Sequence, residues 1–141
     1  MFKSVVIMLI VSFIFLTGCM ASGPIFSPVE KADSGKAVVY IYRPFTIFHC
    51  MWAPDIYIDE VKHGPLKNNG YLVYFIEPGK RIIEIRGTMF SETTTFLTLY
   101  PDLDAGKDYY FRLSIGSSKY VFAQIKKEYA ISEITGTKKS D

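Results

Sequence analysis

Side chains that could bind a soft metal ion or act as a nucleophile gather in the first half of the chain: His49, Cys50, Met51 and, further on, His63. Imidazole, thiolate and thioether groups are the ligands that suit copper, and a thiol beside a histidine can act as a nucleophile. Neighbouring residues of an extended chain point to opposite faces, so His49 and Cys50 are expected to diverge. A metal- or thiol-handling protein is therefore our first alternative, not our main prediction.

The same residues belong to an unusually apolar segment, residues 45–53, called the apolar loop below. We expect this loop to pack over one end of the domain. If it is exposed instead, we predict that Phe48, Met51 and Trp52 bind a partner. Exposed apolar patches mark contact sites, and aromatic side chains supply much of the binding energy at protein interfaces.

Acidic residues offer a different chemistry, because two carboxylates flanking a cleft can hydrolyse a glycosidic bond. Asp59 and Glu60 lie close to His63 in the sequence, but the chain has no Gly-x-Ser-x-Gly, His-Glu-x-x-His or glycine-rich phosphate-binding motif. We predict no catalytic residue, no bound metal and no cofactor apart from a covalent lipid. A small glycan- or peptide-directed enzyme is the second alternative.

The N-terminal residues have the pattern of a secretory signal. Lys3 precedes an almost wholly apolar run over residues 5–15, which has the length of a signal-peptide core and is shorter than the roughly 20 residues of a membrane-spanning helix. Leu16-Thr17-Gly18-Cys19 then resembles a bacterial lipobox. That resemblance implies a signal peptide over residues 1–18, cleavage before Cys19, a diacylglycerol thioether on its sulfur and, usually, a fatty acid on its amine.

Two further expectations depend on this motif. Met20 follows the cysteine where an aspartate usually retains lipoproteins on the inner membrane of Gram-negative bacteria. In such a host we therefore expect an outer-membrane anchor, with the domain on the periplasmic face. The chain has two cysteines, so a lipid on Cys19 leaves Cys50 without an intramolecular disulfide partner. An unlipidated secreted form is the alternative.

Length and charge restrict the class of protein. The chain has 141 residues, with 16 Lys and Arg against 14 Asp and Glu, which suits one domain and excludes a TIM barrel. Half of the residues are apolar, so the chain is not intrinsically disordered. A net charge of +2 does not indicate a nucleic-acid binder. The partners that we expect are the membrane, through the anchor, and an envelope protein.

Residues 36–134 are expected to form the folded domain, after a flexible tether over residues 19–35 and before a disordered tail over residues 135–141. β-Branched and aromatic residues between turn signals predict about seven strands, which favours a mainly-β, small antiparallel β-sandwich. The many strand tyrosines are attributed to β-propensity rather than to an exposed aromatic binding face. Residues 126–134 suit a short helix. The predicted strands span residues 36–43, 55–59, 71–76, 81–86, 94–100, 108–115 and 119–125.

Turn chemistry gives two finer predictions. Pro78-Gly79 indicates a tight turn, so we expect residues 71–76 and 81–86 to pair as a hairpin. Asp59-Glu60 lacks the glycine that favours a tight turn, so we expect the chain after Ile58 to turn later, at His63-Gly64-Pro65.

Several blocks of sequence together resemble the DUF2846 family of bacterial lipoproteins, a domain family of unknown function. The blocks are Gly35 to Pro44, Ile56 to Asp59, Gly70 to Tyr74, Glu77 to Lys80 and Ala105 to Tyr110. The resemblance covers residues 35–125 and implies a small β-sandwich of transthyretin-like or immunoglobulin-like type. It implies no activity and no site residues. Together these observations predict a lipid-anchored envelope lipoprotein that acts as a non-catalytic binding or tethering module.

Overall fold

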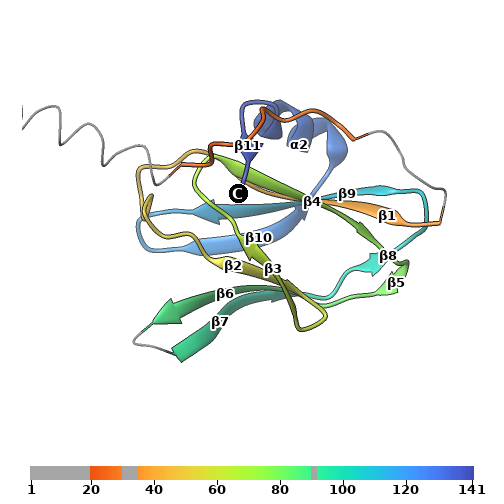
Figure 1. Cartoon of the computed structure of the whole chain (residues 1–141), viewed down its shortest axis with the longest axis horizontal. Helices are drawn as coiled ribbons and strands as arrows, with labels where there is room; N and C mark the ends of the chain where they lie inside the picture. The colour runs from red at the N-terminus through yellow and green to blue at the C-terminus, as the bar shows by residue number, and fades with distance from the viewer. Residues whose placement is uncertain (1–19, 30–34, 90–91) are drawn as a thin grey trace, which may run out of the picture.

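The computed structural model describes residues 20–29, 35–89 and 92–141 and shows two β-sheets packed face to face (Figure 1). The first sheet has the strand order β10-β9-β1-β4-β11, and the second has the order β3-β2-β6-β7. A two-stranded ribbon of β5 and β8 lies at one end of the molecule (Figure 1). The strands of the first sheet are β1 (Ala37–Arg43), β4 (Gly70–Ile76), β9 (Asp108–Ile115), β10 (Tyr120–Ile125) and β11 (Lys138–Lys139). The others are β2 (Asp55–Ile58), β3 (Val61–Pro65), β5 (Gly79–Lys80), β6 (Ile83–Met89), β7 (Glu92–Leu99) and β8 (Asp102–Leu103).

The prediction of a mainly-β, sandwich-like fold is confirmed. Each of the seven predicted segments forms a strand, and the four strands that were not predicted have two to five residues. Most neighbouring strands are antiparallel, but β1 pairs with β9, and β4 with β11, in parallel.

Every residue of β1 is buried, because layers cover both faces of the first sheet. Successive strand residues point to opposite faces. Ala37, Val39 and Ile41 join the core between the two sheets. Tyr40 and Tyr42 join a second cluster on the other face, with Tyr110, Phe26 and the helix residues Ala130 and Ile134. These tyrosines are therefore core residues and not an exposed binding face.

The helix α2 (Lys127–Ile134) forms most of this outer layer and confirms the predicted C-terminal helix. Glu133 fixes it to the sheet, because its carboxylate accepts hydrogen bonds from the Tyr42 hydroxyl and the Arg112 guanidinium, both at 2.6 Å. No helix within the described ranges is long and apolar enough to cross a membrane.

The prediction of a flexible tether is wrong for residues 20–29, which lie against the domain. The Phe26 ring packs edge-on against Tyr40 and Tyr71, with centroid distances of 5.6 and 5.2 Å. The backbone N–H groups of Ala21, Gly23 and Phe26 donate hydrogen bonds to the carbonyls of Asn68, Lys139 and Thr137. The predicted signal peptide, Cys19 and residues 30–34 of the tether lie outside the described residues.

The prediction of a disordered tail over residues 135–141 is also wrong. Lys138–Lys139 form β11 beside β4, and the side chains of Thr137 and Ser140 are buried. The Ser140 hydroxyl accepts a hydrogen bond from the Lys67 N–H and donates one to the Pro65 carbonyl. Polar residues hold this tail through hydrogen bonds, so apolar patterning could not reveal it.

Two turn predictions are wrong as well. β4 lies in the first sheet and β6 in the second, so they do not form a hairpin. Gly79, with φ of +111°, turns the chain into β5, which pairs with β8 as the chain crosses between the sheets. The β2–β3 hairpin turns directly at Asp59-Glu60, whose φ values of 48° and 68° are both left-handed. Positive φ at both central residues is what a type I′ turn requires.

Candidate functional site

The apolar loop connects β1 to β2 at one end of the sandwich, and most of its apolar side chains are exposed. The exposed fractions are 59% for Phe45, 72% for Ile47, 45% for Phe48 and 79% for Met51. The expectation that the loop packs over the end of the domain is therefore wrong for these residues. Trp52 and Cys50 are half-buried. The chain from Pro44 to Pro54 has no charged residue.

Arg43, the last residue of β1, donates hydrogen bonds from its buried side chain to the backbone of this loop. Its side chain is fully buried. Its Nη1 donates to the Trp52 carbonyl at 2.5 Å, and its Nη2 donates to the His49 carbonyl at 2.9 Å. Burial lowers the pKa of Arg43 to about 10, so the guanidinium stays charged at neutral pH. A buried cation thus fixes both ends of the turn formed by residues 49–52.

Asn68 holds the other side of the loop. Its side-chain amide accepts a hydrogen bond from the Thr46 N–H at 3.1 Å and donates one to the Thr46 carbonyl at 2.8 Å. The Thr46 hydroxyl donates to the Ile115 carbonyl at 3.2 Å, at the end of β9. These contacts make the loop an ordered platform for its exposed apolar side chains.

A pocket of about 270 Å³ opens beside the loop and is lined by His49, Trp52, Phe96 and Tyr120. The Trp52 ring packs against Phe96 of β7 and Tyr120 of β10, with both centroid distances at 5.3 Å. Gly87 on β6 permits this arrangement, because a Cβ atom there would lie 2.7 Å from Phe96 Cε2 and 3.1 Å from Trp52 Nε1. Four aromatic rings at the open edge of the sandwich suit a flat or apolar ligand group.

The two histidines considered as metal ligands, His49 and His63, pack against different residues. His63 lies on β3, where its ring packs against Tyr74 at 4.6 Å and burial lowers its pKa. The exposed His49 contacts Tyr120 instead, at 5.5 Å. In the part of the chain that the structure describes, no three His, Cys, Asp or Glu side chains form a group that could hold a metal ion.

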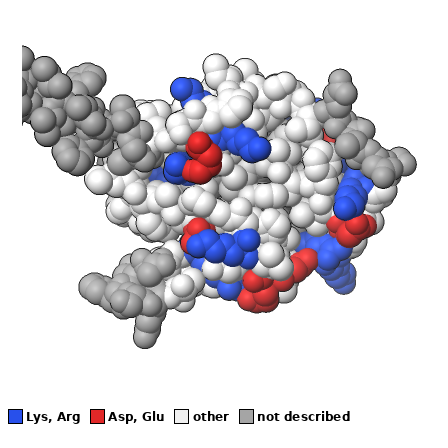
Figure 2. All heavy atoms as spheres, viewed as in Figure 1, with Lys and Arg blue, Asp and Glu red and all other residues white. Residues whose placement is uncertain are grey.

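The apolar loop itself is uncharged, and most of the ion pairs of the described residues lie elsewhere. In Figure 2 the visible left edge of the molecule, where the loop lies in Figure 1, is white, while blue and red residues lie at the bottom, at the right and also left of centre. Lys67, which precedes Asn68, pairs with Asp141 at 3.9 Å.

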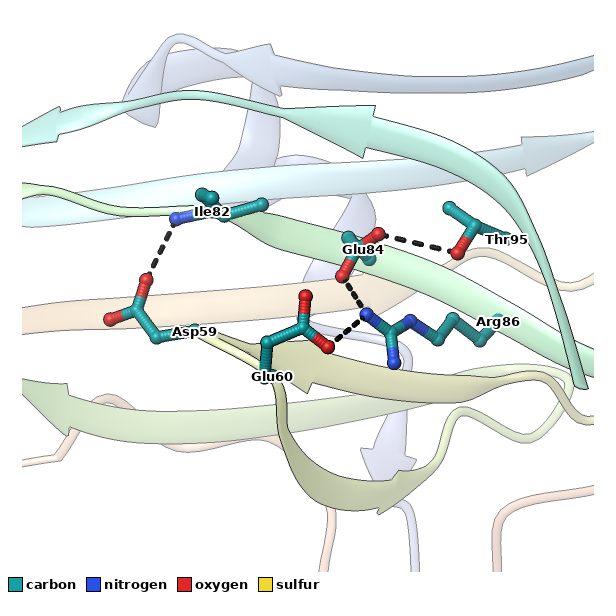
Figure 3. Close-up of polar contacts among 6 residues, drawn as sticks. All are labelled: Asp59, Glu60, Ile82, Glu84, Arg86 and Thr95. Atoms are coloured by element: carbon teal, nitrogen blue, oxygen red, sulfur yellow. Dashed lines mark hydrogen bonds and ion pairs between the residues drawn. The ribbon is translucent and has the colours of Figure 1, made fainter.

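One charged cluster lies on the second sheet (Figure 3). There Arg86 donates to Glu84 and, at 2.6 Å, to Glu60, and its guanidinium lies 4.2 Å from the centre of the Tyr57 ring. The two carboxylates raise the pKa of Arg86.

Asp59 and Glu60, the carboxylates considered for hydrolysis, form hydrogen bonds and ion pairs within this cluster and the neighbouring turn. Asp59 accepts hydrogen bonds from the Ile82 N–H and from Arg81 Nη1, both at 2.9 Å. Glu60 pairs with Arg86 (Figure 3). These contacts brace the β2–β3 hairpin against β6, and Asp59 and Glu60 thus have a structural role in this arrangement.

The Asp59-Glu60 turn gives a first testable prediction. Glu60→Gly should have a free energy of unfolding about 1 kcal/mol higher than Glu60→Ala, because only glycine adopts a left-handed φ without a steric cost. Both variants lose the same carboxylate, so the difference between their free energies of unfolding, measured by urea denaturation, reports the cost of the left-handed backbone conformation. Equal stability of the two variants would contradict a strained Glu60.

The fold and the site together define a small mainly-β domain of two packed sheets, with an apolar loop and an aromatic pocket at one end. The chain belongs to the DUF2846 family, described as proteins of unknown function, whose model matches residues 33–125. This finding confirms the resemblance noted in the sequence. No curated protein matches the chain.

The sequence singled out part of this site. Phe48 and Met51 are exposed and Trp52 lines the pocket, but Arg43 and Asn68 were not expected to matter. Arg43 belongs to the Tyr-x-Tyr-Arg-Pro block of the family resemblance, and a charged residue at the end of a fully apolar strand was the available signal. Asn68 carried no comparable signal.

Proposed function

We propose that this protein is a lipid-anchored lipoprotein of the cell envelope that acts as a non-catalytic binding or tethering module. The carrying observation is the lipobox Leu16-Thr17-Gly18-Cys19 after an apolar run of signal-peptide length. Two or three acyl chains on Cys19 would hold the domain on a bilayer, since each buried methylene contributes about 0.8 kcal/mol. Met20 favours the outer membrane, with the domain facing the periplasm.

The apolar loop is the contact surface in this proposal. Exposed Phe48 and Met51, with half-buried Trp52 beside them, offer apolar area on a loop that Arg43 and Asn68 hold by hydrogen bonds. Exposed apolar patches of this kind mark sites of protein or membrane contact. Arg43 and Asn68 position the loop without reaching the exposed surface themselves, since both are buried.

Replacement of the lipobox cysteine tests the anchor. In cells that express the full chain, Cys19→Ala should move the protein from the membrane fraction to the soluble envelope fraction, or leave an uncleaved precursor. The wild-type protein should sediment with membranes and resist extraction by high salt. Cys50→Ala is the matched control, because it removes the other cysteine and should leave the distribution unchanged. A Cys19→Ala protein that is cleaved and still held in membranes would contradict the proposal.

A further inference from the structure

The first described residues lie beside the apolar loop. Met20, which follows Cys19 in the sequence, forms an isolated parallel bridge with Asn68. The Ala21 N–H donates to the Asn68 carbonyl at 3.0 Å. The side chain of the same asparagine bonds both backbone groups of Thr46 in the loop. One buried residue thus fixes the position of the loop relative to the point where a lipid on Cys19 would be attached.

No free chain separates that attachment point from the domain. Consecutive Cα atoms are about 3.8 Å apart, so Cys19 is one peptide unit from the docked Met20. Residues 20–29, the described part of the expected tether, are held by Phe26 and by backbone hydrogen bonds. A lipid on Cys19 would therefore bring this end of the domain close to the bilayer surface.

The surface at this end suits an interface between water and hydrocarbon. Phe45, Ile47, Phe48 and Met51 are exposed there, and Met20 is 36% exposed. The loop itself has no charge, and the ion pair of Lys67 with Asp141 lies beside Ser22, near the point of attachment, where charged groups would meet lipid headgroups. Lys119, an exposed cation on the turn after β9, follows the strand end to which Thr46 bonds. Aromatic and long apolar side chains next to a cation are typical of segments that lie in the headgroup region.

We propose that the apolar loop inserts into the headgroup region of the same bilayer that holds the lipid on Cys19, so that the domain lies flush on the membrane. This inference rests on the proposed lipid anchor and names the occupant of the same contact surface. The bilayer is favoured over a protein partner because Met20, next to the proposed anchor, and the apolar loop lie at the same end of the domain. The β5–β8 ribbon, whose second strand begins two residues after Tyr100, lies at the opposite end (Figure 1) and would face away from the bilayer.

Trp52 provides the measurement, because it is the single tryptophan of the chain and lies next to Met51. The full lipoprotein, purified from membranes, is reconstituted into vesicles of phosphatidylethanolamine and phosphatidylglycerol with or without brominated acyl chains. Since interfacial segments lie about 5–10 Å deep, shallow bromine atoms should reduce the Trp52 emission about twofold. The double substitution Phe48→Ser with Met51→Ser should remove most of this quenching. Both side chains are exposed, so the fold should persist, as circular dichroism can check.

Tyr100→Ser is the matched control, because Tyr100 is 76% exposed and follows the end of β7. It should leave the quenching unchanged. An acylated, vesicle-bound wild-type protein without quenching would overturn this inference alone and leave the loop free for a protein partner. Undiminished quenching in the double variant would also overturn it. A purified protein without acyl mass on Cys19 would overturn the proposed function and this inference together.

Discussion

Replacing Arg43 with methionine is expected to lower the free energy of unfolding by about 3 kcal/mol. Methionine keeps much of the volume but none of the donors, so the Trp52 carbonyl loses the bond from Nη1 and the His49 carbonyl loses the bond from Nη2. The His49 carbonyl keeps the bond from the Trp52 N–H, which limits the loss. Each hydrogen bond to a charged group contributes about 1.5–3 kcal/mol.

Urea denaturation followed by Trp52 fluorescence measures this loss and reports on the loop at the same time. Arg43→Lys should recover part of the stability, because an ammonium restores the charge without the fork of donors. Lys36→Met is the matched control, since it removes a cation whose ion pair with Glu77 is solvent-exposed. It should have little effect. An Arg43→Met protein as stable as the wild type would show that the buried guanidinium does not support the loop.

The second large effect is expected for Phe26→Ala, which should release residues 20–29 from the domain. Truncating a buried phenylalanine costs about 3–5 kcal/mol in a closed core. Here the segment can undock instead, so the loss of global stability is limited to the free energy of docking. Hydrogen exchange measures this directly, because the N–H groups of Ala21, Gly23 and Phe26 are bonded to the domain. Their exchange should become at least about tenfold faster, which corresponds to 1.4 kcal/mol.

Ile25→Ala is the matched control for Phe26→Ala, since the neighbouring side chain is 66% exposed. It should leave the exchange of these amides unchanged. If both variants exchange at the wild-type rate, the Phe26 ring does not hold the segment.

Local patterning was sufficient for the strands, the C-terminal helix and the family. It did not predict the ordered structure of the two terminal segments, because polar groups far away in the sequence hold them. Lys138–Lys139 pairs with β4 and with the N-terminal segment through backbone bonds, which no side-chain pattern reports. The apolar sequence of β1 on both faces did carry a signal, because a strand buried on both sides needs a second covering layer. That layer is α2 with residues 20–29.

The two turn predictions were wrong for a different reason. Asp59-Glu60 adopts two left-handed conformations although neither residue is glycine, and the bonds from Arg81, Ile82 and Arg86 compensate for the strain. Those partners lie on or next to β6, so their contribution depends on the tertiary fold. The expected hairpin of residues 71–76 with 81–86 failed because both segments are apolar enough for either sheet, and sequence alone could not assign them to different sheets.

The sequence predicted which residues make up the apolar loop of the site, but it did not predict how they are arranged. An apolar loop rich in aromatic residues could be read from residues 45–53, whereas its exposure depends on Arg43 and Asn68 beneath it. The position of Met20 beside the loop depends on a single bridge to Asn68. Such a contact between residues far apart in the sequence becomes visible only in the folded chain.

The most direct test of the lipid anchor is the mass of the N-terminal peptide of the protein purified from cell membranes. We predict a chain that begins at Cys19 and carries the mass of a diacylglycerol thioether, with a further acyl group on its amine. A chain that retains residues 1–18, or one that begins at Cys19 or later without lipid mass, would contradict the account.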